Sequence, residues 1–446
     1  MQKCFGFLRG DRLHEIMRLA LPSVVSNITV PLLGLVDLAI VGHLGAASYI
    51  GAVAVGSMIF NVIYWIFGYL RMSTSGETAR AYGAGCDGAL PLRANLRVAL
   101  WVAGALMVLQ GLLKRVALWL MAPSADVVPL VETYFDICIW GSPAMLCLYV
   151  LSGWFVGMQN TRIPMMVAVT QNVVNIVASV VFVFGFQWNI RGVALGTLTA
   201  QWVGVLLSAW MAYRLWKQQK SRGTVAESAS VSRMEDNQRG REHVDLFVRT
   251  LCLVGVNLFF TSVGSRQGAV VLSVNSLLMT FFMLFSYVMD GFAYAAEALC
   301  GKYAGARMWR DLWDVCRHLF VLSAIVTVVF TMAYMIGGRA LLCLLTDNKE
   351  VMAASGPYLW WVYLIPLAGV VSFICDGICI GISASRLMLV ATSLGAMVFF
   401  VIYFLFRSSM GNHALWLALV IYLMLRGWLQ LWLVLRRRAQ RRCSQE

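Results

Sequence analysis

The chain has 446 residues, of which 60% are apolar and only 13% are charged, and its mean hydropathy is +0.75. Ordinary soluble domains carry roughly 25% charged residues, so this composition excludes a soluble globular protein and indicates a protein that lies in lipid. The formal net charge is +14. We attribute it to basic residues that flank membrane helices and meet anionic lipid headgroups, and we expect no nucleic-acid partner.

Hydrophobic stretches long enough to cross a bilayer recur along the chain. A membrane-spanning helix needs about 20 apolar residues, and only helices or closed barrels satisfy the backbone in hydrocarbon. The stretches are too long for barrel strands, so the sequence predicts an all-α integral membrane protein with twelve transmembrane helices. In chain order they cover residues 16–42, 50–78, 95–121, 134–158, 164–187, 192–216, 247–264, 270–300, 315–337, 356–382, 387–407 and 413–435.

Basic residues are distributed unevenly among the segments that flank these spans. With the N-terminus inside, 27 of the 35 Lys and Arg residues belong to cytoplasmic segments, including Arg249 and Arg426, and seven belong to the outer segments. Arg71 lies within a span. By the positive-inside rule, this asymmetry predicts a multi-pass protein of the inner (plasma) membrane with both termini in the cytoplasm.

A polar segment divides the chain into two halves. Residues 217–245 form the only long hydrophilic interior stretch. It predicts a cytoplasmic linker between an N-terminal six-helix lobe at 1–216 and a C-terminal six-helix lobe at 246–446, which ends in a basic cytoplasmic tail.

The two halves also share a short pattern at a shift of 221 to 224 residues. Because each half has an even number of spans, the repeat is parallel, about an axis along the membrane normal, as in many alternating-access transporters. Its Gly-xxx-Gly pairs suit close helix packing. The matching pairs are Gly153 and Gly377, Gly157 and Gly381, Arg162 and Arg386, Pro143 and Pro366, and Tyr82 and Tyr303.

Asp37 is the first candidate functional residue, because it is the only charged group in an apolar run long enough to cross the membrane. An ionised Asp at the centre of a membrane helix costs about 2.5–3.5 kcal/mol on insertion scales. Such residues face polar cavities and take part in proton or ion movement. We therefore predict that Asp37 binds a coupling ion or a proton.

Other acidic residues lie within or at the ends of spans. We interpret Glu77, Glu297 and Asp136, near helix ends, as groups that reach the headgroups or form local ion pairs. Asp290 and Asp376 lie deeper in their spans. With Glu297 they are candidate coupling groups of the second lobe, although pairing with buried Arg71 or bonding to hydroxyl groups is an equal alternative.

Polar side chains line one face of the fifth predicted span, and a second polar pair lies in the sixth. Their spacings of three and four residues place each set on one face of a helix. Such groups can adjust the proton affinity of a nearby carboxyl, or they can simply hold helices together. The residues are Gln171, Asn172, Asn175 and Ser179 in the fifth span and Thr197 and Gln201 in the sixth.

Soft methionines and flat aromatic rings suit varied hydrophobic and cationic ligands, and several could line a substrate pocket or pack in the core. Cys375 and Cys379 lie one helical turn apart without His neighbours, so we expect no metal site. No enzyme motif or nucleotide-binding loop is present, which predicts no cofactor and no enzymatic activity. The candidate substrate contacts are Phe60, Tyr64, Trp154, Phe155, Met279, Phe282 and Met283.

Together these motifs resemble one transporter family. The stretches are Pro31-Leu-Leu-Gly-Leu-Val-Asp37-Leu-Ala-Ile-Val-Gly-His-Leu-Gly45, Gly51-Ala-Val-Ala-Val-Gly-Ser57, Phe67-Gly-Tyr-Leu-Arg-Met72 and Asp376-Gly-Ile-Cys-Ile-Gly381. The chain resembles the multidrug and toxic compound extrusion (MATE) family, in its DinF-like branch, over essentially its whole length.

The resemblance implies a cation-coupled antiporter that exports amphipathic, often cationic organic compounds by alternating access. It implies that Asp37 is the coupling carboxylate and that Asn175 and Thr197 are its partners. Ser179 departs from the family pattern, in which a second acidic residue is common, and this loss favours protons over sodium. The alternatives are a lipid-linked precursor flippase of the same superfamily and, more remotely, an intramembrane lipid-modifying enzyme.

Overall fold

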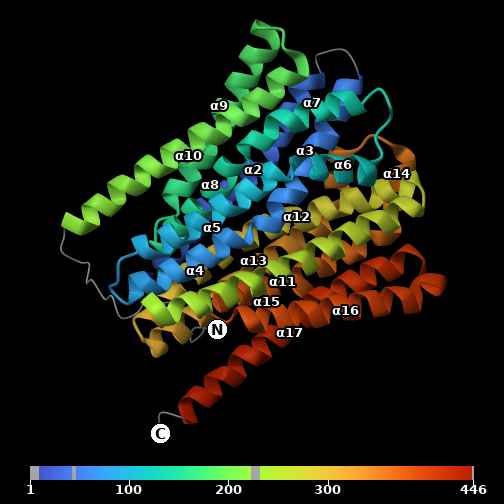
Figure 1. Cartoon of the computed structure of the whole chain (residues 1–446). Helices are drawn as coiled ribbons and strands as arrows, with labels where there is room; N and C mark the ends of the chain where they lie inside the picture. The colour runs from blue at the N-terminus through green and yellow to red at the C-terminus, as the bar shows by residue number, and fades with distance from the viewer. Residues whose placement is uncertain (1–9, 43–46, 222–231, 444–446) are drawn as a thin grey trace. The chain divides into compact units, whose positions relative to one another are not determined.

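The computed structural model describes residues 10–42, 47–221 and 232–443, and these residues form helices without any β-strand (Figure 1). The helices are α2 (Gly10–Gly42), α3 (Ala47–Phe67), α4 (Tyr69–Gly83), α5 (Ala89–Val108), α6 (Gln110–Met121), α7 (Val128–Cys138), α8 (Ser142–Gly157), α9 (Arg162–Val180), α10 (Asn189–Ser221), α11 (Ser232–Arg266), α12 (Ala269–Gly305), α13 (Trp309–Leu345), α14 (Lys349–Ser355), α15 (Leu359–Gly381), α16 (Ser385–Met410) and α17 (Asn412–Cys443). Three short segments join them, namely η1 (Ile139–Gly141), η2 (Val181–Gly185) and η3 (Gly356–Tyr358).

These helices match the predicted pattern of membrane spans. Ten helical stretches of the described chain are long and apolar enough to cross a bilayer, and α5 with α6, bent by 69°, makes an eleventh if the pair crosses as one span. The 33-residue helix α2 covers the first predicted span. Several spans are broken, because α3 with α4 and α7 with α8 each form one crossing, Ser48–Gly83 and Val128–Gly157.

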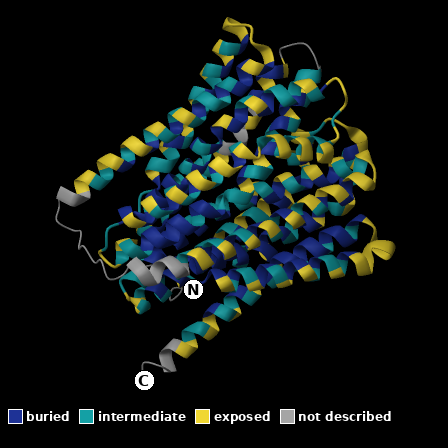
Figure 2. Cartoon of the chain, in the orientation of Figure 1, coloured by how far each residue is buried: buried dark blue, intermediate teal, exposed yellow. Residues whose placement is uncertain are grey.

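Large apolar side chains lie on the outer faces of many helices, where Figure 2 shows exposed residues in yellow. Trp101 is 82% exposed, Val108 is 83% exposed and Ile336 is 81% exposed. Large apolar side chains exposed along many helices are unusual on a soluble monomer. These faces therefore fit contact with lipid.

The chain divides into two compact units by its internal contacts. The first unit is Leu21–Ser232, and the second unit combines Met1–Ala20 with Arg233–Glu446. Within the first unit α4 packs on α8 and α9 packs on α10, and within the second α12 packs on α15 while α16 and α15 pack on α17. Helix α2 starts in the second unit and continues into the first.

The two repeated glycine pairs make equivalent close helix contacts. A Cβ atom at Gly153 on α8 would lie 2.3 Å from the Arg71 carbonyl oxygen of α4, and one at Gly377 on α15 would lie 2.4 Å from the Ala293 carbonyl oxygen of α12. Real Cβ atoms do not approach backbone this closely, so each position requires glycine. The structure confirms that the repeated glycines serve close packing.

The predicted polar linker is helical at both of its ends. Residues 217–221 continue α10, and α11 already begins at Ser232. The central residues 222–231 lie outside the described part of the chain. Charged and amide residues such as Arg, Glu and Gln have good helix propensity, so their polarity alone did not specify a loop.

Candidate functional site

Asp37 lies on α2 and is buried, with 6% of its surface exposed. The Thr197 hydroxyl of α10 donates to Asp37 Oδ2 at 3.4 Å. The Asn175 side-chain amide of α9 in turn donates to Thr197 Oγ1 at 3.1 Å. Residues from three helices therefore form one short hydrogen-bond chain that ends on the carboxylate. Asp37 and Thr197 are 160 positions apart in the sequence.

Several acceptor atoms around this chain have no hydrogen-bond partner among the described residues. They are Asp37 Oδ1, Asn175 Oδ1 and Ser179 Oγ, and each is shielded from solvent. An unpaired buried polar atom costs about 1–3 kcal/mol, and an ionised carboxylate costs more. A proton on Asp37, or a cation among these oxygens, would remove that cost, so the arrangement is suited to exchanging a positive ion.

The polar face of α9 is its buried face. Asn175 and Ser179 are both 0% exposed, whereas the neighbouring Val173 and Val177 are 54% and 57% exposed. A Cβ atom at Gly196 on α10 would lie 2.1 Å from Ser179 Oγ. Glycine at position 196 therefore lets α10 approach α9 closely enough for Thr197 to reach both Asn175 and Asp37.

Asn172 belongs to the same face of α9 but has another role. Its side-chain amide donates to the Thr29 carbonyl oxygen of α2 at 2.8 Å. This bond joins α9 to α2 eight residues before Asp37. Asn172 therefore positions α2 and does not contact the carboxylate itself.

The aromatic candidates of the first unit are packed in two apolar clusters. Phe60 stacks on Phe135 with ring centroids 5.2 Å apart, and the Tyr64 hydroxyl lies 3.4 Å from Ser142 Oγ. Trp154 is fully buried and donates its indole N–H to the Gly88 carbonyl oxygen at 2.7 Å. Phe155 packs on it with centroids 5.2 Å apart, so this pair stabilises the helix core.

The candidates of the second unit lie on α12. Phe282 is 9% exposed and its ring centroid lies 6.5 Å from that of Phe373 on α15. Met279 and Met283 are half-buried on the same helix. Their spacing of three and four residues places the three side chains on one face of α12.

Asp376 is bound within a buried polar cluster of the second unit. Arg249 of α11 and Arg426 of α17 both donate to Asp376 Oδ2, the second at 3.4 Å. Gln430 donates to Oδ1 at 2.8 Å, and Arg426 also donates to Ser372 Oγ at 3.1 Å. Asp376 thus has two ion-pair partners, Arg249 and Arg426, and neither is Arg71, the alternative partner considered from the sequence.

The two arginines correct the charge count made from the sequence. Arg249 and Arg426 are 2% and 5% exposed, so they are buried in the helix bundle and do not face headgroups as flanking residues would. Both fall inside predicted spans, at 247–264 and 413–435. An arginine within a span usually has an internal acidic partner. This rule could have predicted from the sequence that Arg249 and Arg426 form buried ion pairs.

The remaining acidic residues have different surroundings. Asp136 is exposed and pairs with Lys114 at 2.9 Å, which confirms a local ion pair. Glu77 does not reach toward headgroups, because it is 9% exposed and accepts from Asn95 at 3.0 Å. Glu297 does not reach toward headgroups either, since only 1% of it is exposed. Asp290 is half-buried on the same helix, α12.

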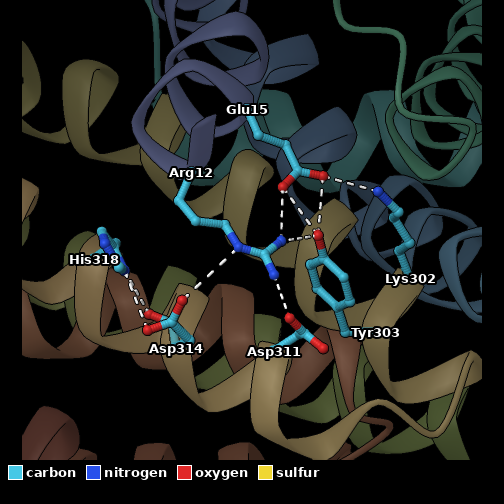
Figure 3. A network of polar contacts seen from close by, with 7 residues as sticks. All are labelled: Arg12, Glu15, Lys302, Tyr303, Asp311, Asp314 and His318. Atoms are coloured by element: carbon cyan, nitrogen blue, oxygen red, sulfur yellow. Dashed lines mark hydrogen bonds and ion pairs between the residues drawn. The ribbon is translucent and has the colours of Figure 1, made fainter. Parts of the chain in front are cut away.

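A network of charged groups holds the first turns of α2 against α12 and α13 within the second unit (Figure 3). The Arg12 guanidinium donates to Glu15 at 3.1 Å and also to Asp311 and the Tyr303 hydroxyl. Its Nε lies 3.8 Å from Asp314. On the other side Lys302 donates to Glu15 at 2.8 Å.

The sequence did not predict this network. Its residues are almost 300 positions apart in the chain, and they appeared only as charges that flank predicted spans. Partial burial opposes the ionisation of Glu15, but Lys302, Tyr303 and Arg12 outweigh it and hold the pKa of Glu15 below its usual value. Glu15 therefore contributes stability above its unfolded pKa of about 4.3. That contribution is lost only as pH falls through the lower folded value.

The structure thus combines membrane-spanning helices, a repeated packing pattern and a buried carboxylate with amide and hydroxyl partners, which together define a membrane transporter. The chain belongs to the MATE family. The family model described as MatE matches it twice, at residues 22–181 and 246–405. The two matches are offset by 224 residues, which confirms the parallel repeat. A second family model, described as lipid II flippase MurJ, matches residues 135–234.

Individual proteins agree with this assignment. The chain is 35% identical to DNA damage-inducible protein F of Escherichia coli (strain K12), over 95% of this chain and 92% of that protein. It is 23% identical to the probable multidrug resistance protein NorM of Thermotoga maritima, over 76% and 74% of the two chains. The crystal structure of MATE in the bent conformation superposes with a TM-score of 0.83 at 21% identity, over 99% of both chains.

Proposed function

We propose that this protein is a secondary active antiporter that exports amphipathic, often cationic organic compounds in exchange for protons. The observation that carries the proposal is that Asp37 is buried and that, among the described residues, one of its oxygens, Oδ2, has a donor, Thr197, while Oδ1 has none. Family membership and relatives described as multidrug resistance proteins support the substrate class. Phe60, Tyr64, Met279, Phe282 and Met283 are the proposed substrate contacts, and Trp154 and Phe155 are not retained.

Protons fit the residues around Asp37 better than sodium does. Burial in an apolar helix bundle favours the neutral form of a carboxyl group. A hard cation prefers several oxygen ligands with negative charge, and here one carboxylate is accompanied by the neutral oxygens of Asn175 and Ser179. Asp37 would take up a proton from one side of the membrane and release it on the other as substrate moves in the opposite direction.

We further propose that lobes at 1–216 and 246–446 alternate between inward-open and outward-open arrangements, with residues 217–245 as the tether and both termini in the cytoplasm. The excess of basic residues in the predicted cytoplasmic segments supports this orientation, and it persists when buried Arg249 and Arg426 are left out. Helix α2 is the proposed mechanical link. It carries Asp37 in the first unit and is bound by Arg12 and Glu15 in the second.

Substituting Arg12→Gln is expected to loosen the start of α2 without changing Asp37. The side chain loses its charge to Glu15, Asp311 and Asp314, and a network of this kind is worth about 1–3 kcal/mol. Amide hydrogen exchange of residues 10–20 should become roughly tenfold faster or more, and export should slow at every pH. Arg18→Gln is the matched control, because Arg18 is exposed on the same helix. Equal exchange rates in both variants would contradict the link.

The coupling ion is tested in proteoliposomes with separately imposed proton and sodium gradients and a panel of fluorescent organic cations. We expect efflux in response to a pH difference with sodium absent. A proton entering down 100 mV supplies about 2.3 kcal/mol, which supports a roughly fiftyfold gradient of a neutral solute at tenfold per 1.36 kcal/mol. Exchange of one monovalent cation for one proton is electroneutral, so only the pH difference drives it. Efflux that responds to sodium alone would disprove proton coupling.

A flippase for a lipid-linked precursor is the second candidate, because the lipid II flippase model matches residues 135–234. The match covers part of the first lobe and most of the linker, and it includes α9 and α10, which carry Asn175 and Thr197. Translocation of a fluorescent lipid-linked precursor in the same proteoliposomes, without efflux of any organic cation, would favour this reading over drug export.

A further inference from the structure

A cavity of about 750 Å³ lies in the second unit, and neither Asp376 nor any residue of the Arg12 network lines it. Three segments line it: the early part of α11, the connection from α15 to α16 and the last turns of α17. This cavity takes no part in the proposed transport cycle. Its lining is strongly basic, with Arg241, Arg386, Arg436 and Arg437 around it.

The two acidic residues of the lining are already engaged by the protein. Glu242 is 8% exposed and accepts a hydrogen bond from Ser383. Asp245 is 7% exposed, accepts from Ser385 at 3.1 Å and lies 3.8 Å from Arg386. These two carboxylates of α11 hold the connection between α15 and α16 in place through their bonds to Ser383 and Ser385. Four arginines against two carboxylates leave the cavity with two excess positive charges, so it suits an anion.

The arginines point to a phosphate group in particular. Guanidinium groups bind phosphate oxygens with paired hydrogen bonds, and Arg241, Arg386 and Arg436 are exposed. The first turn of α16 also lines the cavity, and its N-cap Ala384 has no side-chain cap. The positive end of this helix adds to the field of the arginines.

Exposed apolar side chains lie on the same helices, near the residues that line the cavity. On α17, Trp428, Trp432 and Leu435 follow one another at helical spacing and are 58%, 54% and 45% exposed. On α11, Val244 and Leu251 are 61% and 41% exposed. Arg436 lies over the Trp432 ring, 5.4 Å from its centroid. Exposed tryptophan side chains are enriched at the interface between hydrocarbon and headgroups. We therefore place the opening of the cavity at the depth of the lipid phosphates.

We propose that this cavity binds the phosphate headgroup of an anionic phospholipid, with the acyl chains lying along the exposed apolar faces of α11 and α17. Basic pockets between membrane helices recognise anionic headgroups in this way. The exposed apolar residues on these helices favour a lipid over a free phosphate, because a soluble anion would gain nothing from them. Lipid binding at this site would make the connection between α15 and α16 sensitive to the lipid composition of the surrounding membrane.

The test is lipid binding to the purified full chain in detergent. Dioleoylphosphatidylglycerol is titrated and followed by native mass spectrometry and by the thermal unfolding midpoint. The triple variant R241Q/R386Q/R436Q should bind it roughly a hundredfold more weakly, because each arginine near an anionic lipid contributes about a factor of five. The control R93Q/R97Q/R162Q removes three exposed arginines from the first unit and should bind as the unchanged protein does.

Two further probes separate the sources of phosphate. Dioleoylphosphatidylethanolamine, which has no net charge, should bind weakly to every variant, and inorganic phosphate should neither stabilise the protein nor displace the anionic lipid. Equal lipid binding by the triple variant and its control would overturn the proposal, as would equal protection by inorganic phosphate. If the triple variant does not fold, Arg386→Gln alone, whose side chain is 80% exposed, should weaken binding about fivefold.

Discussion

Asp37→Asn is expected to abolish gradient-driven export while the protein remains folded. The amide has nearly the shape of the carboxyl group and keeps an oxygen for the Thr197 hydroxyl at the position of Oδ2. It cannot exchange a proton, so the variant is fixed in a state that resembles neutral Asp37. Efflux in proteoliposomes under an imposed pH difference should fall to the level of empty liposomes, a loss of at least tenfold.

The stability of this variant distinguishes a functional role from a structural one. An ionised carboxylate with one unpaired buried oxygen is unfavourable for folding, so the neutral amide should leave the unfolding midpoint unchanged or raise it. Asp136→Asn is the matched control, because Asp136 is exposed and its pair with Lys114 lies on the surface, where it contributes about 0–1 kcal/mol. That variant should export normally. Normal export by well-folded Asp37→Asn would show that another group carries the ion.

The sequence predicted the spans well because their signal is local. About 20 consecutive apolar residues specify a membrane helix wherever they occur, and the repeated glycines marked close packing in both units. The breaks within spans were not predicted. The 69° bend between α5 and α6 lies at Leu109, two residues before Gly111, and a single glycine within a helical pattern is too weak a signal to predict a break.

The candidate site shows the same limit. Helical spacing placed Asn175 and Ser179 on one face, and family resemblance joined Asn175 and Thr197 to Asp37, which agrees with the observed hydrogen bonds. Spacing within one helix says nothing about which other helix lies opposite. The arginine partners of Asp376 are 127 and 50 positions away, so only the folded chain shows that this carboxylate forms an ion pair, whereas Asp37 has no cationic partner among the described residues.

Asp376 has arginine partners, so we expect substitutions in its cluster to lower stability, whereas Asp37→Asn is expected to abolish export without lowering stability. Arg249→Met should destabilise the protein by about 3 kcal/mol, because removing one partner of a buried ion pair leaves a charge without full compensation. The loss should lie at the low end of the usual 3–5 kcal/mol, since Arg426 and Gln430 still donate to Asp376. The measurement is the unfolding midpoint in detergent, with Arg266→Met, an exposed arginine at the end of the same helix, as the control.

Export separates a structural Asp376 from a coupling one. If the ion pair only holds α11, α15 and α17 together, the folded fraction of Arg249→Met should transport at the rate of the unchanged protein with the same dependence on pH. Asp376→Asn combined with Arg249→Met should lose less stability than the sum of the single changes, because the paired charges are removed together. A folded Arg249→Met of unchanged stability that no longer responded to a pH difference would instead place Asp376 on the ion pathway, and the second unit would then hold a coupling group that acts with Asp37.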